Sequence, residues 1–334
     1  MSKNPNPVPS TVVQATESPQ DLSNILGSEI VWTPEVELFG RQVGKWMSLE
    51  LPGAYVFGVQ RSGKSAALAY LSREIEQFVG QPVFVSIVNI ERGLADRETS
   101  LVAEWLGQEN VLSNTNSPAR LRKALREHFM EQTRQRETDR VLIVIDEAQN
   151  ATRMHLGQIL ALGNVLSQSK ERRLRVFTLL VGQPELRAFV DSYVTMNELQ
   201  LVGRFFERKW EFVGIAPGDI PLVLKAYEMD VVCSDGSVQP PAVAALFPQA
   251  WQDGWRPNGW ATVIAEGIGN VAARCGLPRE QRIPMQHLRS TLLGVLAYAK
   301  ALGDPHTPIP VEVVEQALRS EERRVGKECR ALCR

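Results

Sequence analysis

The residues with the clearest chemistry form one glycine-rich segment with the pattern G-x-x-x-x-G-K-[ST]. Its glycines let the backbone curl, so that successive N–H groups face a phosphate. Lys64 would supply a positive charge to the β- and γ-phosphates, and the Ser65 hydroxyl would coordinate Mg²⁺. The segment predicts binding of ATP or GTP with Mg²⁺ by Gly58, Val59, Gln60, Arg61, Ser62, Gly63, Lys64 and Ser65.

Two acidic residues follow a continuous apolar run about 80 residues further along the chain. The run, 141–145, is typical of a strand buried on both faces of a parallel sheet, and it ends at Asp146 and Glu147. At the carboxyl end of such a strand Asp146 would hold Mg²⁺ through water, and Glu147 would polarise the attacking water. The alternative is that both acids only cap the next helix. Their pairing with a complete phosphate-binding loop favours ATP hydrolysis.

A third apolar run, 176–181, ends in polar groups. Gln183 is placed two residues beyond it, where a side chain at a strand end can reach a γ-phosphate. We interpret Gln183 as a candidate sensor of that phosphate. The alternative is a plain strand-to-turn transition.

Strand and helix patterns alternate around these residues, which predicts a parallel α/β sheet. The expected strands cover 54–57, 83–90, 141–145 and 176–181. The expected helices between them cover 65–78, 118–134 and 154–168. Beyond about residue 216 the strand pattern fades, and helices are expected over 220–228, 284–301 and 311–318.

Composition places the chain among ordinary globular proteins, with 44% hydrophobic and 22% charged residues in 334. No apolar run approaches the roughly 20 residues that span a bilayer, and the N-terminus lacks the pattern of a secretory signal. We therefore expect a cytoplasmic protein without a membrane partner. The first residues are rich in Pro, Ser, Asn, Thr and Gln, which predicts a flexible arm over 1–28.

The last sixteen residues, 319–334, have the sequence that a common sequencing adapter yields on translation, and we expect them to be non-native. Without them the chain has 31 basic and 35 acidic residues, a net charge of −4 (37 − 6 and 38 − 3). Only Cys233 and Cys275 then remain, which indicates neither a disulfide framework nor a zinc site.

The fold class expected from these patterns is α/β. A P-loop nucleotide domain, with a parallel sheet flanked by helices, covers 29–215, and a small helical lid covers 216–318. The lid contains a stretch rich in Gly, Pro and Trp. Its tryptophans could form a binding surface, but they more often complete a small core.

Three segments together resemble AAA+ ATPases of the TnsC/TniB group, which regulate target selection in transposition, and more distantly MuB. They are Arg61-Ser62 before Gly63-Lys64, Ile145-Asp146-Glu147-Ala148 and Val181-Gly182-Gln183-Pro184-Glu185-Leu186. The likeness covers roughly 30–300, with its distinctive motifs in 55–215. It implies ATP-dependent rings or helical filaments on double-stranded DNA, which engage a DDE transposase. In CRISPR-associated transposons it also implies a TniQ-type adaptor.

The resemblance also implies roles for three arginines. Arg204, in Gly203-Arg204-Phe205, matches the arginine that reaches a neighbouring subunit's ATP, and Arg208 is the reserve candidate. The alternative is a surface arginine on a charged helix. Arg289 would be the second sensor in the lid, although the expected Gly-Arg pattern is absent. The Trp-rich stretch, 230–262, is longer than the family's usual lid.

DNA binding by a slightly acidic chain needs a local basic surface. Arg92 and Arg97 follow the second expected strand, and four more cations lie on or near one helix: Arg120, Arg122, Lys123 and Arg126. Facing the pore of a ring, they would track phosphates without reading sequence. The alternative is a solvated helix face, since Glu127 and Glu131 dilute the charge.

The function expected is that of an ATP-hydrolysing regulator that oligomerises on double-stranded DNA and recruits or activates a transposase. One rival is a helicase loader or initiator-like ATPase, which would more often carry a winged-helix domain. Another is a secretion ATPase of the ExeA kind, which shares the Gly-Gln-Pro-Glu-Leu segment. Such proteins usually carry a membrane-spanning helix and a peptidoglycan-binding domain, and the sequence indicates neither.

Overall fold

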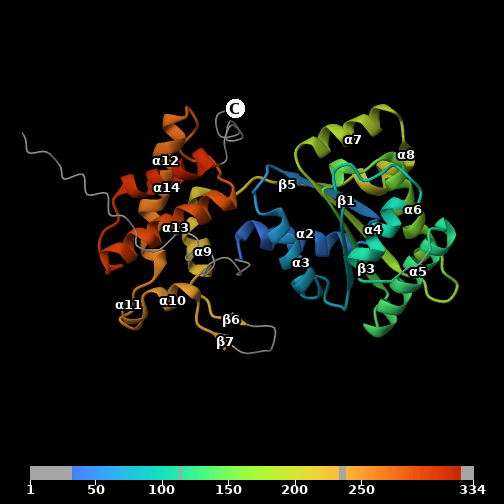
Figure 1. Cartoon of the computed structure of the whole chain (residues 1–334), viewed down its shortest axis with the longest axis horizontal. Helices are drawn as coiled ribbons and strands as arrows, with labels where there is room; N and C mark the ends of the chain where they lie inside the picture. Colours follow the sequence, from blue (N-terminus) through green and yellow to red (C-terminus); the bar gives the residue numbers. More distant parts are fainter. Residues whose placement is uncertain (1–31, 113–114, 233–237, 325–334) are drawn as a thin grey trace, which may run out of the picture. The chain divides into compact units, whose positions relative to one another are not determined.

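The computed structural model describes residues 32–112, 115–232 and 238–324 of the chain. The expected N-terminal arm, Cys233 and residues 325–334 lie outside the described residues. The chain forms two compact units, Trp32–Gly214 and a second that includes Ile215 onward (Figure 1).

A five-stranded parallel sheet organises the first unit, with the strand order β2-β3-β4-β1-β5. Its strands are β1 (Gly53–Gly58), β2 (Phe84–Asn89), β3 (Arg140–Asp146), β4 (Arg175–Gly182) and β5 (Lys209–Phe212). The first four lie at the expected positions. The short edge strand β5 was not expected, because its exposed Lys209 and Glu211 interrupt the apolar pattern.

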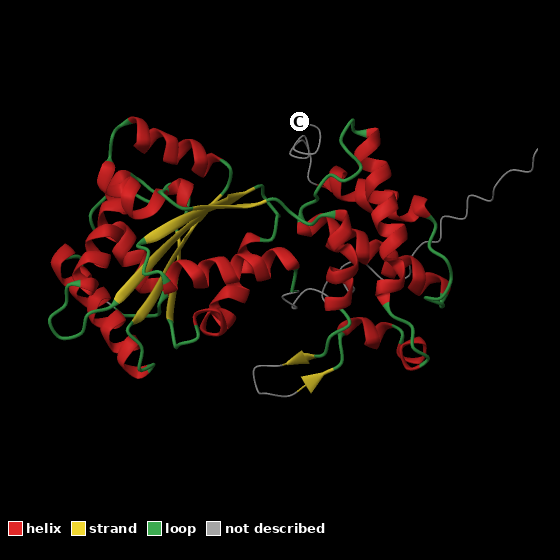
Figure 2. Ribbon diagram, turned by 180° about the vertical axis from the view of Figure 1, so that it is seen from behind, coloured by secondary structure: helices red, strands yellow, loops and turns green. Residues whose placement is uncertain are grey.

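Helices cover both faces of the sheet, as Figure 2 shows. One face packs against α2 (Pro34–Ser48) and α3 (Lys64–Val79). The other carries α4 (Ser100–Gln108), α5 (Pro118–Gln135), α6 (Arg153–Ser167) and α7 (Glu185–Thr195). Three short turns complete the unit: η1 (Ala148–Asn150), α8 (Leu199–Leu201) and the π-helix η2 (Val202–Phe206). This arrangement confirms the predicted α/β class.

Helix α2 was not expected, although its start has clear local signals. The Thr33 side chain accepts a hydrogen bond from the N–H of Val36, and Pro34 occupies the first turn. Gly40 and Gly44 let α2 approach α3 closely, because a side chain at either position would collide with Phe78. The close contact places α2 beneath the strand that carries the phosphate-binding loop.

The second unit is mainly helical. Its longer helices are α12 (Ala261–Arg274), α13 (Met285–Leu302) and α14 (Val311–Arg324), and α14 packs against both of the others. The shorter elements are η3 (Pro217–Asp219), α9 (Ile220–Ala226), β6 (Val231–Val232), β7 (Val238–Gln239), α10 (Ala242–Leu246), α11 (Pro248–Gln252) and η4 (Pro257–Trp260). No helix among the described residues is long and apolar enough to cross a bilayer.

Two of the three clustered tryptophans complete the core of this unit. Trp255 and Trp260 are 7% and 6% exposed, with ring centroids 4.9 Å apart. Trp251 is partly buried, and the Arg256 guanidinium lies 3.8 Å from its ring centroid. The prediction that these residues serve a small core is confirmed for Trp255 and Trp260.

Candidate functional site

The strand register brings the three sequence motifs to one edge of the sheet. Phe57 in β1 lies beside Gly182 in β4, and Asp146 ends β3 next to Asn89 of β2. The phosphate-binding loop begins at Gly58, so it leaves the sheet at the same carboxyl edge. Parallel α/β sheets bind ligands at this edge because the loops and helix N-termini that hold them gather there.

Backbone shape in the phosphate-binding loop depends on its glycines. Gly63 has φ = 104° and directly precedes α3, a conformation that a side chain would strain. At Gly58 a Cβ would lie 2.6 Å from the carbonyl oxygen of Phe212 on β5. The backbone of Arg61 is also in the left-handed region, with φ = 62°, and this conformation contributes to the curl of the loop. The N–H groups that begin α3 therefore face the space in front of the loop.

Lys64 is folded onto the loop that precedes it. Its Nζ donates to the carbonyl oxygens of Gly58 (2.7 Å) and Val59 (2.9 Å), and the residue is only 8% exposed. Burial lowers the pKa of Lys64, while Glu147 and Asp146 raise it in opposition. The ammonium is thus poised beside the position that a β- or γ-phosphate would occupy.

Asp146 and Glu147 form the acidic side of the site. Burial raises the pKa of Asp146, against a lowering contribution from the Glu147 N–H, which donates to Asp146 Oδ1 over 2.9 Å. Glu147 itself has the left-handed conformation, with φ = 53°. The chain therefore turns directly after β3, and Asp146 and Glu147 lie next to one another at this turn.

Gln183 connects the acidic side to the phosphate-binding loop. Its Nε2 donates to Glu147 Oε2 over 3.1 Å, and its Oε1 accepts from Gln60 Nε2 over 2.9 Å. The structure therefore brings together candidate residues from all three motifs, Gln60, Glu147 and Gln183. A side chain in this position can respond to a γ-phosphate and alter the environment of Glu147 at the same time.

Gln149 is a residue of the site that sequence reasoning missed. Its Nε2 donates to Glu147 Oε2, and its Oε1 accepts from the Gln183 N–H over 3.1 Å. A side chain at Gly182 would collide with this Gln149 oxygen. The only available signal was its position two residues after Glu147, where a polar side chain has many ordinary roles.

The site has the groups that a magnesium triphosphate needs. The Ser62 hydroxyl is buried and has no hydrogen-bond partner among the residues that the structure describes, which leaves a polar atom inside the loop for a ligand to satisfy. Ser65 is exposed at the start of α3, and Asp146 is the last residue of β3. Hydroxyl and carboxylate oxygens are ligands that Mg²⁺ accepts alongside phosphates and water.

Arg204 lies at the amino ends of the parallel strands, opposite the carboxyl ends that carry the phosphate-binding loop. Its carbonyl oxygen would lie 2.8 Å from a Cβ at Gly53, the first residue of β1, whereas Gly58 is the last. At about 3.3 Å per residue, the strand separates these ends by about 16 Å. The guanidinium donates to Asn164 Oδ1 on α6. Arg208, more exposed, pairs with the adjacent Glu207 at 3.7 Å.

The basic residues expected to bind DNA are exposed, but nearby carboxylates neutralise part of their charge. Arg92 and Arg97 are exposed in the segment after β2, and the α5 cations are exposed as well. Arg122 pairs with Glu98, and Lys123 lies 3.6 Å from Glu127. Arg120 and Arg126 form no ion pair among the described residues. Arg289 lies on α13, in the second unit.

Comparison with known proteins agrees with this geometry. Residues 53–190 match the family model of the AAA domain. The chain has the P-loop AAA+ fold. Its core motifs lie within the matched range, from the phosphate-binding loop through Gln183. No curated protein sequence gives a significant match.

The structural comparison extends the similarity over both units. The ORC2 protein of Aeropyrum pernix, in ADPNP–ADP complexes, is 14% identical with a TM-score of 0.58, and the match covers 90% of this chain and 71% of that chain. The ADP form of the same protein is also 14% identical, with a TM-score of 0.56, and this match covers 89% of this chain and 72% of that chain. At this identity the likeness shows the AAA+ fold alone.

Proposed function

We propose that this chain is an ATP-dependent regulator that oligomerises on double-stranded DNA and recruits or activates a DDE transposase. The AAA+ fold supplies a nucleotide site, and hydrolysis of ATP would control the assembly. The transposase, like a TniQ-type adaptor, is proposed from the TnsC/TniB resemblance of the three motifs. Ring or filament form is proposed on the same ground.

The position of Arg204 is the observation that best supports assembly. Arg204 and the phosphate-binding loop lie at opposite ends of β1, so this arginine is too distant to serve its own nucleotide. A neighbouring copy that placed its loop against this edge would bring its γ-phosphate within reach. An arginine aimed at a transferring phosphoryl group stabilises the developing charge and is worth about 10³–10⁵ in rate.

The proposed reaction uses residues from each motif. Lys64 and the loop N–H groups would hold the phosphates, and Ser65 and Asp146 would hold Mg²⁺, which neutralises charge on the phosphate oxygens. Glu147 would accept a proton from the attacking water. Gln183 would sense the γ-phosphate, and Arg289 would be a second sensor from the lid. Gln183 already contacts Glu147 and Gln60, which supports its role.

Double-stranded DNA would bind through phosphate contacts from the exposed basic residues. Arg120 and Arg126 are the strongest candidates, because no carboxylate pairs with them among the described residues. Arg92, Arg97, Arg122 and Lys123 would add to the same surface. Binding of this kind follows the DNA backbone and falls steeply with salt.

Electron microscopy with negative stain tests the proposal directly. The chain is mixed with double-stranded DNA and either a slowly hydrolysed ATP analogue or ADP. Rings or filaments that require DNA and the analogue are the expected result, and Lys64→Ala by itself should form none, because none of its own phosphate-binding loops would hold the analogue. Absence of assembly on DNA in both nucleotide states would contradict the proposal. Pull-down with a transposase encoded beside the gene then tests the partner.

An initiator-like or helicase-loading ATPase is the second candidate. Two of the similar solved structures are of an ORC2 protein, and the match extends into the helical second unit. This candidate predicts binding to a replicative helicase rather than to a transposase. Pull-downs with both partners, at matched nucleotide states, separate the two functions.

A further inference from the structure

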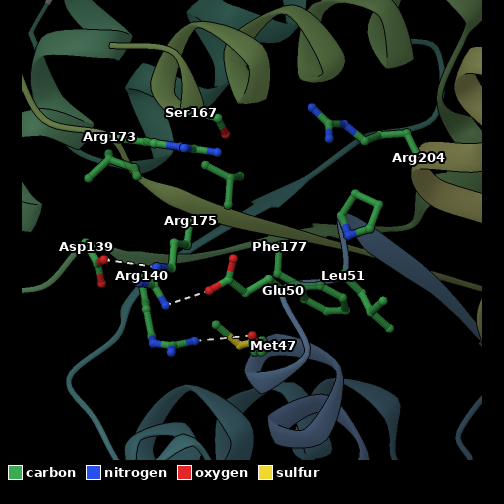
Figure 3. Close-up of a pocket in the computed structure, with 13 residues that line it drawn as sticks. Met47, Glu50, Leu51, Asp139, Arg140, Ser167, Arg173, Arg175, Phe177 and Arg204 are labelled. Carbon is green, nitrogen blue, oxygen red and sulfur yellow. Dashed lines mark hydrogen bonds and ion pairs between the residues drawn. The ribbon is translucent and has the colours of Figure 1, made fainter. Parts of the chain in front are cut away.

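A cavity of about 540 Å³ opens at the amino edge of the sheet, away from the phosphate-binding loop (Figure 3). It is formed by α2 and the segment between α2 and β1, the starts of β3 and β4, the end of α6 with the loop that follows it, and the π-helix η2. Four arginines and two carboxylates line it, which gives the lining a net charge of +2.

Two of the four arginines are fully engaged. Arg175 pairs with Glu50 at 2.7 Å and with Asp139 at 3.1 Å, so it uses both carboxylates of the cavity. Arg140 is 7% exposed, and its guanidinium donates to Gln81 Oε1 (2.9 Å) and to the Met47 carbonyl (3.2 Å). These contacts support the wall of the cavity.

The excess charge belongs to Arg173 and Arg204. Arg204 donates to the neutral amide oxygen of Asn164, and neither arginine forms an ion pair within the part of the chain that the structure describes. Figure 3 shows the two side chains extending toward one another from opposite sides of the cavity, with Ser167 beside the end of Arg173. Two guanidiniums without carboxylates, beside a hydroxyl, match the chemistry of a phosphate group.

We propose that this cavity is a phosphate-binding site in which Arg173 acts together with Arg204 on the γ-phosphate of ATP held by a neighbouring copy. The inference rests on the proposed function, since it requires assembly. It adds a second cation from the loop between α6 and β4, a position that the sequence motifs do not mark. Two guanidiniums can share the three γ-phosphate oxygens, whereas one guanidinium covers two at most.

A mixing experiment tests where Arg173 acts. Arg173→Gln keeps an intact phosphate-binding loop but lacks the proposed cation. Lys64→Ala lacks a working phosphate-binding loop but keeps Arg173. We expect Arg173→Gln alone to lose about 10- to 100-fold in ATP hydrolysis, the size of one charge-assisted hydrogen bond. An excess of Lys64→Ala protein should restore hydrolysis by supplying Arg173 to the neighbouring site. Full activity of Arg173→Gln alone, or a loss that Lys64→Ala does not rescue, would overturn the inference.

Control variants separate this inference from the proposed function. Lys170→Gln removes an equal charge from the same loop outside the cavity, and it should leave hydrolysis unchanged. Arg204→Gln should lose activity and be rescued in the same mixture. If Arg204→Gln behaves so while Arg173→Gln stays fully active, only the inference fails. If the unaltered chain neither assembles nor hydrolyses ATP, the proposed function fails first.

The phosphate could instead come from nucleic acid. Binding of double-stranded DNA by Arg173→Gln and Lys170→Gln is therefore compared by fluorescence anisotropy in the presence of the ATP analogue. Equal affinity, together with rescue in the mixture, supports a nucleotide phosphate. A selective loss of DNA affinity in Arg173→Gln, without rescue of hydrolysis, would assign the cavity to the DNA backbone and overturn the inference.

Discussion

Glu147 accepts hydrogen bonds from two glutamine side chains, Gln149 and Gln183, at the same carboxylate oxygen. Such bonds hold the carboxylate in place. They also occupy lone pairs that a general base needs for water. Gln60 extends the chain of contacts to the phosphate-binding loop. A phosphate that drew Gln183 away would therefore remove one of the two hydrogen bonds that Glu147 Oε2 accepts.

The substitution Glu147→Gln tests the role of this carboxylate. It removes the base but keeps a similar shape, so we expect hydrolysis to fall by about 10²–10⁴-fold while ATP affinity stays within a few-fold. Single-turnover hydrolysis and nucleotide binding are measured on the same preparation. The exposed acid Glu91 provides a matched control, Glu91→Gln. Unchanged hydrolysis in Glu147→Gln would refute the assignment.

Asp146 links catalysis to stability. Burial raises the pKa of Asp146, so the folded chain binds this proton at higher pH than the unfolded chain does. Stability therefore falls as pH rises through the folded pKa. Asp146→Asn removes the buried charge, and we expect a higher Tm than that of the unaltered chain at neutral pH. The difference should shrink as pH falls toward 3.8, the ordinary carboxyl value.

Thermal unfolding over a pH series, without nucleotide or Mg²⁺, measures this effect. Asn can still accept the hydrogen bond from the Glu147 N–H, so the local turn should survive. The same variant should lose Mg²⁺-dependent ATP binding. A variant less stable than the unaltered chain at neutral pH would show that Asp146 does not carry the expected burial penalty.

At the scale of elements, packing of α2 on α3 supports the strand that carries the phosphate-binding loop. Gly44 lies on the buried face of α2, where a Cβ would lie 2.7 Å from the carbonyl oxygen of Phe78. Backbone atoms cannot move aside as a flexible side chain can. The glycine therefore sets the distance between two helices that cover one face of the sheet.

Gly44→Ala should destabilise the first unit by about 1–3 kcal/mol, the usual cost of overpacking. Gly107→Ala is the matched control, because a Cβ at that helical position meets nothing within 4 Å. There the exchange should stabilise by about 0.5–1 kcal/mol, since glycine is the poorer helix former. Chemical denaturation of both variants gives the comparison. Equal stability changes would show that α2 can shift away from Phe78 without cost.

At the scale of the whole molecule, the groups needed for the proposed reaction lie at opposite ends of the sheet strands, so each reaction would use groups from two copies of the chain. One edge presents Lys64, Asp146 and Glu147, and the other presents Arg204. Neither edge is sufficient alone under the proposed mechanism. Assembly would therefore switch hydrolysis on, because it brings the two edges of different copies together.

This division predicts that hydrolysis per protomer rises with protein concentration and with added double-stranded DNA. Arg204→Ala should lower the rate at high concentration by about 10³-fold or more. Its rate should vary little with concentration, since assembly no longer supplies the missing charge. Steady-state assays over a dilution series measure both effects. A rate per protomer independent of concentration in the unaltered chain would contradict hydrolysis between copies.

The sequence alone determined the local parts of this protein. The phosphate-binding loop, the acidic strand end and the apolar strands were recognisable because their chemistry depends on adjacent residues. The same holds for the α/β class, which follows from the alternation of strand and helix patterns. Strand β5 was missed because Lys209 and Glu211 interrupt its apolar pattern and its partner β1 is distant in sequence, whereas helix α2 was missed although its Thr33-Pro34 start is a local signal.

Only the tertiary structure decided which side chains meet. Gln149 joins the site through a hydrogen bond to residue 183, and Arg173 faces Arg204 across a cavity lined by several strand starts. These contacts depend on strand order and register, which place residues from distant segments side by side. Local patterns specify single elements, whereas the site requires the edges at which those elements meet.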